Sequence, residues 1–223
     1  VVSPQEKEAL PINELLIKSV LGQPKGEGET LYYSFPATPV DADFLVVYHK
    51  EILERYLQSL GFTAKGIEEG LAVILSELPD EQFTGIGISF GGGMTNMCLA
   101  FMASSVTGFS VARGGDWIDQ QVGAAVDMTA ARVSKFKEGM LDLSKTEGLT
   151  KVEEALSIYY NHLIEYVLTN FKKELGKMRS IPDFTKPIPV VLSGGTALPK
   201  GFLQRFEKIL SKIHFPIDIG EIR

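Results

Sequence analysis

The chain has 223 residues, of which 44% are hydrophobic and 22% are charged, and its formal net charge is −6. This composition is typical of a globular protein, long enough for one large domain or two small ones. The acidic balance disfavours nucleic acid and anionic membranes as partners, because both would attract a surplus of Lys and Arg.

Hydrophobic spacing and turn residues predict four elements in the first part of the chain. They are a helix over 11–21, a strand that begins at Thr30 and stops at Pro36, a helix over 40–62, and a second helix over 67–78. Gly61 fits the position just after a helix, where the left-handed conformation is common. The short segment FTAKG reads as a connection between the two helices.

From Thr84 onward the pattern changes to strands, then to helices, and then to a last strand with a glycine turn. The predicted elements are strands over 85–90, 97–102 and 106–112, helices over 117–126, 130–137 and 152–175, a strand in IPVVLSGG, a helix over 202–213, and a closing strand in FPIDIG. Both glycine clusters follow a strand, and open α/β sheets bind ligands at the carboxyl ends of their strands.

The single cysteine, Cys98, lies in the apolar run MCLAFM and cannot form an internal disulfide. A buried thiol in a reducing compartment is the expected state. No apolar run reaches the roughly 20 residues of a membrane-spanning helix, and no signal peptide is visible. We therefore expect a cytoplasmic protein without a membrane span.

Four segments carry a family resemblance: GISFGGGMTN, RGGDWID, FKEG and SGGTALPKG, in this order. Alone, a glycine run is as typical of a tight hairpin as of a phosphate-binding loop. Together, the four segments resemble the actin-like ATPases of the actin, heat-shock chaperone and sugar-kinase superfamily, and most of all the prokaryotic actin homologues. The resemblance implies an α/β fold, a ribonuclease H-like actin-type ATPase domain with a mixed sheet flanked by helices.

The resemblance also implies how the chain is divided. Residues 1–83 would be part of actin-like domain I and residues 84–223 would be domain II. Within domain II, 84–119 and about 150–223 would carry the sheet, and about 120–150 would be a small helical insertion. The family's first phosphate loop, an Asp-x-Gly, and its closing helix have no match, so we expect them upstream of Val1 and downstream of Arg223.

The same resemblance assigns residues to a bound ATP or ADP. The assigned residues are Gly91, Gly92, Gly93, Met94 and Thr95 at the terminal phosphates, Gly115 at the ribose, Lys137 and Glu138 at the sugar and base, and Gly194, Gly195 and Thr196 at the adenine. The alternatives remain open that the glycines only make turns and that Lys137 and Glu138 are an exposed pair near a helix end.

For catalysis, the resemblance points to Glu69, 20 positions before Ser89, and to the hydroxyl of Thr95. A carboxylate at Glu69 could orient the water that attacks the γ-phosphate. Ser89, however, stands where the family has an aspartate that helps hold hydrated magnesium. A neutral hydroxyl contributes less to a divalent cation than a carboxylate does. We expect weak Mg²⁺ binding, no certain metal ligand, and hydrolysis that is slow or absent.

The leading hypothesis is a nucleotide-binding, actin-like cytoskeletal or scaffolding protein that self-associates into filaments or docks a protein partner under nucleotide control. One alternative is a heat-shock-type chaperone or reactivating ATPase that acts on a protein partner. Another is a non-hydrolysing adaptor with the same fold, which the serine at position 89 favours.

Overall fold

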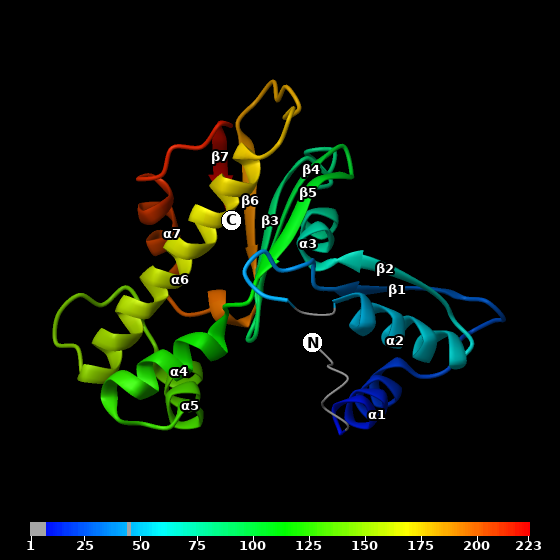
Figure 1. The fold of residues 1–223 in the computed structure, drawn as a ribbon, viewed down its shortest axis with the longest axis horizontal. Helices are drawn as coiled ribbons and strands as arrows, with labels where there is room; N and C mark the ends of the chain where they lie inside the picture. The colour runs from blue at the N-terminus through cyan, green and yellow to red at the C-terminus, as the bar shows by residue number, and fades with distance from the viewer. Residues whose placement is uncertain (1–7, 44–45) are drawn as a thin grey trace.

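The computed structural model describes residues 8–43 and 46–223 and shows helices alternating with strands (Figure 1). In chain order the elements are α1 (Ala9–Leu21), β1 (Thr30–Phe35), α2 (Val46–Ser59), β2 (Thr63–Glu68), α3 (Glu69–Glu77), β3 (Gly85–Phe90), β4 (Thr95–Phe101), β5 (Ser104–Val111), α4 (Gly115–Val126), α5 (Ala130–Met140), α6 (Lys151–Gly176), β6 (Ile188–Ser193), the short 3₁₀ helix η1 (Gly195–Ala197), α7 (Phe202–Leu210) and β7 (Ile219–Ile222). The predicted α/β class is confirmed.

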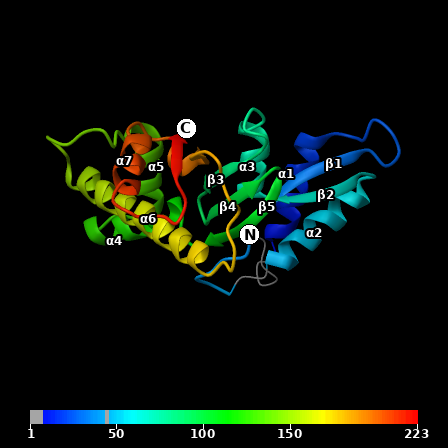
Figure 2. The same ribbon diagram turned by 90° about the horizontal axis from the view of Figure 1, so that it is seen from above.

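Two sheets organise the chain. β1 and β2 form a two-stranded parallel sheet, and the other strands form a five-stranded sheet in the order β5-β4-β3-β6-β7. In the larger sheet, β3 pairs antiparallel with β4 and parallel with β6, so the sheet is mixed, as predicted. Helices α6 and α7 lie on one face of this sheet and α3 lies on the other (Figure 2).

The surroundings of β3 and β6 explain why the sequence pattern predicted the strands of the larger sheet. β3 and β6 are covered on both faces, and a strand in that position is apolar along most of its length. On one face Ile86, Ile88 and Phe90 belong to the main core with α6 and α7. On the other face α3 packs through Ile74 and Leu78 in a separate cluster.

The segment between β1 and α2 links the two sheets. Pro39 forms a β-bridge with Ser110 at the edge strand β5, and Val40 N donates to Ser110 O at 2.9 Å. Asp41 accepts a hydrogen bond from Ala112 N at 2.8 Å and another from the hydroxyl of Tyr166, on α6, at 2.9 Å. This crossing segment holds the small sheet against the edge of the large one.

Three of the predicted elements need correction. Strand β2 was missed, because FTAKG was read as a connection, and the following helix begins at Glu69 rather than at residue 67. Lys and Gly are poor strand formers, and pairing with β1 overrides that preference. The helix expected over 40–62 is Val46–Ser59, with residues 44 and 45 outside the described ones, and the closing strand is Ile219–Ile222.

The domain boundary expected at residue 83 places α3 with the first part of the chain. In the structure, α3 packs on the five-stranded sheet, in one cluster with Cys98 of β4 and Val191 of β6. The division of the chain into actin-like domains stays a prediction.

Among the described residues, no helix is both long enough and apolar enough to cross a membrane.

Candidate functional site

A cavity of about 600 Å³ opens between helices α4 and α5 and the turn that follows β6. We call it the α4–α5 cavity. Six of the residues that the resemblance assigned to a nucleotide line it: Gly92, Gly115, Lys137, Glu138, Gly195 and Thr196. The structure thus brings together residues that are more than 100 positions apart in the chain.

Hydrogen bonds between the glycine clusters join the segments that line this cavity. The carbonyl oxygen of Gly91, in the turn between β3 and β4, accepts from Gly115 N at 3.0 Å and from the Thr196 hydroxyl at 2.9 Å. The neighbouring carbonyl of Gly92 accepts from Asp116 N at 2.9 Å. The two strand-end turns and the first turn of α4 therefore form one connected unit.

The glycines of this unit fall into two groups, those that allow close backbone packing and those that face open space. A Cβ added to Gly114 would lie 2.4 Å from the carbonyl oxygens of both Gly91 and Gly92. Gly194 has a φ of +96°, and its added Cβ would lie 2.3 Å from Phe90 O. A Cβ on Gly93 or Gly195 would meet nothing within 4 Å. The first pair is needed for close packing, while the second pair leaves backbone open to a ligand.

Lys137 lies on α5 and points inward against α4. Its Nζ is 2.8 Å from Asp119 Oδ2 and 3.0 Å from Gly115 O. The side chains of Lys137 and Asp119 are 10% and 5% exposed. The interpretation of Lys137 and Glu138 as an exposed pair is therefore wrong for Lys137. It holds for Glu138, which is exposed and accepts a hydrogen bond from Ser134 at 3.3 Å.

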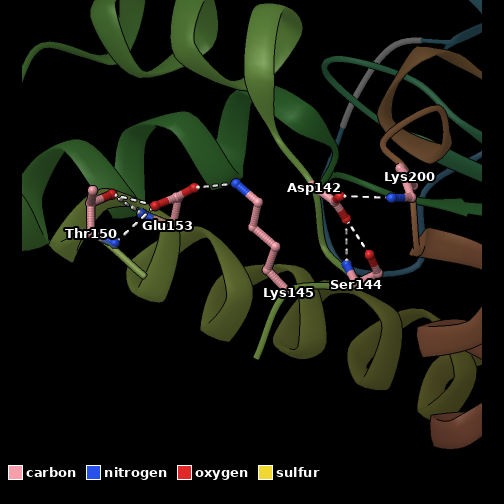
Figure 3. Close-up of polar contacts among 6 residues, drawn as sticks. All are labelled: Asp142, Ser144, Lys145, Thr150, Glu153 and Lys200. Atoms are coloured by element: carbon pink, nitrogen blue, oxygen red, sulfur yellow. Dashed lines mark hydrogen bonds and ion pairs between the residues drawn. The ribbon is translucent and has the colours of Figure 1, made fainter. Parts of the chain in front are cut away.

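Beside the cavity, polar contacts join the loop 141–150 to the turn before α7 and to the start of α6 (Figure 3). Of the loop, Leu141 lines the cavity, and of the turn, Leu198, Pro199 and Lys200 do. Asp142 pairs with Lys200 at 3.0 Å and accepts hydrogen bonds from the backbone and the hydroxyl of Ser144. These bonds, chiefly the hydroxyl bond from Ser144, lower the pKa of Asp142 to about 2. Glu153 of α6 completes a capping box with Thr150 and pairs with Lys145 at 3.4 Å. Polar contacts thus fix the loop 141–150 at both of its ends.

Glu69 lies outside this cavity, in a second one of about 320 Å³ that Ser89 also lines. We call it the Glu69 cavity. Ser89 donates to Glu69 Oε2 at 3.4 Å, and the amide of Asn96 donates to the same oxygen at 2.8 Å. Burial raises the pKa of Glu69, although these two hydrogen bonds act in the opposite direction. Glu69 and Ser89 therefore lie side by side, and the catalytic role of Glu69 stays a prediction.

Thr95 and Met94 do not line either cavity. Thr95 is fully buried, and its hydroxyl donates to Arg113 O at 2.8 Å. Met94 is 8% exposed and contributes its carbonyl oxygen to the turn, where it accepts from Gly91 N. The prediction that the Thr95 hydroxyl faces the terminal phosphates needs correction, because that hydroxyl is already committed to the chain after β5.

The sequence analysis missed several residues of the site. Asp116, Tyr160 and Lys200 line the α4–α5 cavity, and Asn96 contacts Glu69. Asp116 and Asn96 stand inside the quoted segments RGGDWID and GISFGGGMTN, so their positions offered a signal. Tyr160 offered none, since an aromatic residue on a long helix is typical of a core position.

The donors present fit a nucleotide better than a tightly held metal. Open backbone at Gly93 and Gly195 and a cavity of about 600 Å³ suit a nucleoside and an anion. The side chains that donate hydrogen bonds to Glu69 are the neutral Ser89 and Asn96, and Glu77 is the other carboxylate that lines the Glu69 cavity. Among the described residues, no group of three His, Cys, Asp or Glu side chains could hold a metal ion.

A sequence model of one protein family, volactin, matches residues 1–223, the whole chain. The chain belongs to the volactin family. A sequence search of curated proteins found no match.

Among solved structures, a double-helical MamK filament is similar to this volactin chain, with a TM-score of 0.70 and 16% identity over 100% of this chain and 72% of that one. MreB5 of Spiroplasma citri bound to AMPPNP has a TM-score of 0.67 and 15% identity over 96% and 70%. The ethanolamine utilization protein EutJ from Carboxydothermus hydrogenoformans has a TM-score of 0.61 and 17% identity over 96% and 68%. These likenesses confirm the predicted fold, which is that of the actin-like ATPases.

Proposed function

We propose that the chain is the nucleotide-binding part of an actin-like cytoskeletal or scaffolding protein whose self-association into filaments is controlled by bound ATP or ADP. The observation that carries the proposal is the α4–α5 cavity, where Gly92, Gly115, Lys137 and Thr196 meet. Support from similar structures is of two kinds: MamK forms a filament, and MreB5 of Spiroplasma citri binds AMPPNP.

In this proposal the nucleoside lies in the α4–α5 cavity, and the phosphates lie along the glycine turn toward the Glu69 cavity. Gly92 lines the first cavity and Ser89 lines the second, so the turn between β3 and β4 separates the two. The open backbone of Gly93 would donate to phosphate oxygens, which requires a close approach that a side chain would hinder.

Slow hydrolysis follows from the surroundings of Glu69. A bound nucleotide would supply the reacting γ-phosphate, and Glu69 would accept a proton from the attacking water. Burial raises its pKa, which makes the carboxylate a stronger base. Ser89 and Asn96 bring no negative charge to hold a divalent cation, and they bind the carboxylate that the water needs. We therefore expect the bound nucleotide to be hydrolysed slowly.

The test is a calorimetric titration of the full-length protein with ATP, with and without Mg²⁺, followed by sedimentation of the protein in ATP, in ADP and without nucleotide. Binding that depends little on Mg²⁺, with more protein pelleted in one nucleotide state, is the expected result. Absence of any ATP binding would contradict the nucleotide-binding proposal. Pelleting that does not change among the three conditions would contradict nucleotide control.

A second candidate, a non-hydrolysing adaptor, is favoured by the pair of neutral donors on Glu69. Ser89→Asp separates the two candidates, because it restores an acid where a metal could be held. A slow ATPase should then release phosphate faster and in a Mg²⁺-dependent way. Ser104→Asp, exposed at the start of β5, is the matched control. ATP binding without phosphate release in wild type and in Ser89→Asp would favour the adaptor.

A further inference from the structure

The crossing segment between β1 and α2 carries a series of hydrogen bonds that leads from the surface of α6 to Glu69. At the inner end of the series, Ala37 N donates to Asn96 Oδ1 at 2.9 Å, and the amide of Asn96 donates to Glu69 Oε2 at 2.8 Å. Asn96 is 1% exposed. Each end of its buried amide has a protein partner, so the orientation of this side chain depends on where the crossing segment lies.

The middle of the series is made with Ser110, near the carboxyl end of β5. The hydroxyl of Ser110 donates to Ala37 O at 2.7 Å. Its backbone N donates to Thr38 O at 3.0 Å, and its backbone O accepts from Val40 N at 2.9 Å. Ser110 is 0% exposed, as buried as Asn96, and a buried polar group that loses its partner is costly. The crossing segment therefore stays on β5 or leaves it as one unit.

Two prolines make this segment stiff. Pro36 and Pro39 each have a fixed φ, and each biases the residue before it toward extended backbone. Few rotations are left to absorb a movement within the segment. A displacement at its far end, Asp41, is therefore passed on to Ala37.

Asp41 is the outer end of the series and lies at the surface. Its Oδ1 accepts from Ala112 N at 2.8 Å, and its Oδ2 accepts from the hydroxyl of Tyr166, on α6, at 2.9 Å. Burial raises the pKa of Tyr166, and the bond to Asp41 adds to this, so the hydroxyl keeps its proton and donates. Arg113 Cζ lies over the Tyr166 ring, 3.7 Å from its centre, and 4.9 Å from the ring centre of Trp117 on α4. These contacts hold the tyrosine in place.

We propose that Asp41 and Tyr166 are positioning residues for Glu69. They hold the crossing segment on β5, and this segment orients the Asn96 amide, which in turn holds the carboxylate. Neither Asp41 nor Tyr166 lines the α4–α5 cavity or the Glu69 cavity. The inference rests on the proposed function, because it assumes that Glu69 acts on a bound nucleotide. It goes beyond that function in placing control of hydrolysis at a surface contact that the nucleotide does not touch.

Tyr166→Phe tests the series with the smallest change, because it removes the hydroxyl and keeps the ring under Arg113. In the full-length protein without nucleotide, NMR should show the side-chain amide protons of Asn96 and the backbone amide proton of Ala37 exchanging with solvent about ten times faster than in wild type. With ATP, single-turnover phosphate release should be about tenfold slower. The Kd for ATP, measured by calorimetry, should stay within about twofold of wild type, since only the reacting group is displaced.

Tyr159→Phe is the matched control, because it removes a phenol hydroxyl from the same helix. Tyr159 packs on Trp117 with ring centres 5.8 Å apart, and the described hydrogen bonds of the crossing segment do not include it. This variant should keep the exchange rates, the phosphate release and the Kd of wild type. Asp41→Ala removes both outer hydrogen bonds and should act in the same direction as Tyr166→Phe, more strongly, with Asp43→Ala, also exposed, as its control.

Unchanged exchange at Asn96 and Ala37 in both Tyr166→Phe and Asp41→Ala would overturn the inference. Faster exchange with unchanged phosphate release would overturn it as well, by showing that Glu69 does not depend on the crossing segment. Loss of ATP affinity and of phosphate release by the same factor would assign Tyr166 a general structural role instead. A wild type that binds ATP and releases no phosphate would overturn the role of Glu69 and this inference with it, while nucleotide binding would stand. Absence of ATP binding would overturn the inference together with the proposed function.

Discussion

Lys137→Met tests whether the buried ion pair at the α4–α5 cavity holds the two helices together. Lys137 and Asp119 are 2.8 Å apart and 10% and 5% exposed, so water screens their interaction little. Removing the lysine leaves the Asp119 carboxylate buried without a counter-charge, which costs about 3–5 kcal/mol in comparable pairs. Gly115 O also loses a donor. We expect the free energy of unfolding to fall by about 3 kcal/mol and the melting temperature by about 6–12 °C.

Urea and thermal unfolding, followed by circular dichroism, measure this loss. Lys135→Met on the same helix is the control, because Lys135 is exposed and its replacement should cost less than about 0.5 kcal/mol. The double change Asp119→Leu with Lys137→Met should recover most of the loss, since it leaves no unpaired charge. The reasoning is refuted if Lys137→Met destabilises no more than Lys135→Met does.

Four further changes probe the packing around the two cavities. Asn96→Asp would place a second carboxylate beside Glu69, and we expect a loss of about 1–3 kcal/mol at pH 7 that shrinks as the pH is lowered, measured by urea unfolding at pH 7 and pH 5. Glu69→Gln should flatten the dependence of stability on pH. The folded state raises the pKa of Glu69, so this group's contribution is present at low pH and is lost as the pH rises from its unfolded value through its folded one. Gly194→Ala should cost more than about 2 kcal/mol and Gly195→Ala less than about 1 kcal/mol, because only the first has a positive φ and a backbone oxygen 2.3 Å from the added Cβ. Similar melting temperatures for these two alanine variants would contradict that assignment.

The elements that the sequence predicted well are those whose surroundings are uniform along their length. β3 and β6 are covered on both faces, so their residues read as continuous apolar runs. The long helix α6 presents one face to the core through residues such as Leu156 and Leu163, which gives a clear helical period. In these cases a pattern along one segment contains enough information.

β2 shows where such patterns fail. Its six residues are TAKGIE, of which only Ala64 is buried, and it forms a strand because Thr30–Phe35 pairs with it in parallel. A strand that depends on a distant partner leaves a weak local signal. The same limit applies to Lys137. Its helical position was predictable, but its burial follows from Asp119, 18 residues away on a different helix.

Glu69 was a candidate because the resemblance assigns an acidic residue to that position, 20 positions before Ser89 in the sequence. Its surroundings, however, come from three separate segments of the chain. Ala37 N, in the segment that crosses from the small sheet, donates to Asn96 Oδ1 at 2.9 Å. The amide of Asn96 in turn donates to Glu69 Oε2 at 2.8 Å. Asn96 is 1% exposed and uses both ends of its side chain in this way, so it cannot shift without breaking one of the two bonds. The position of the carboxylate is therefore set by the large sheet and by the segment that ties the small sheet to it. No spacing within a single segment could have revealed that dependence.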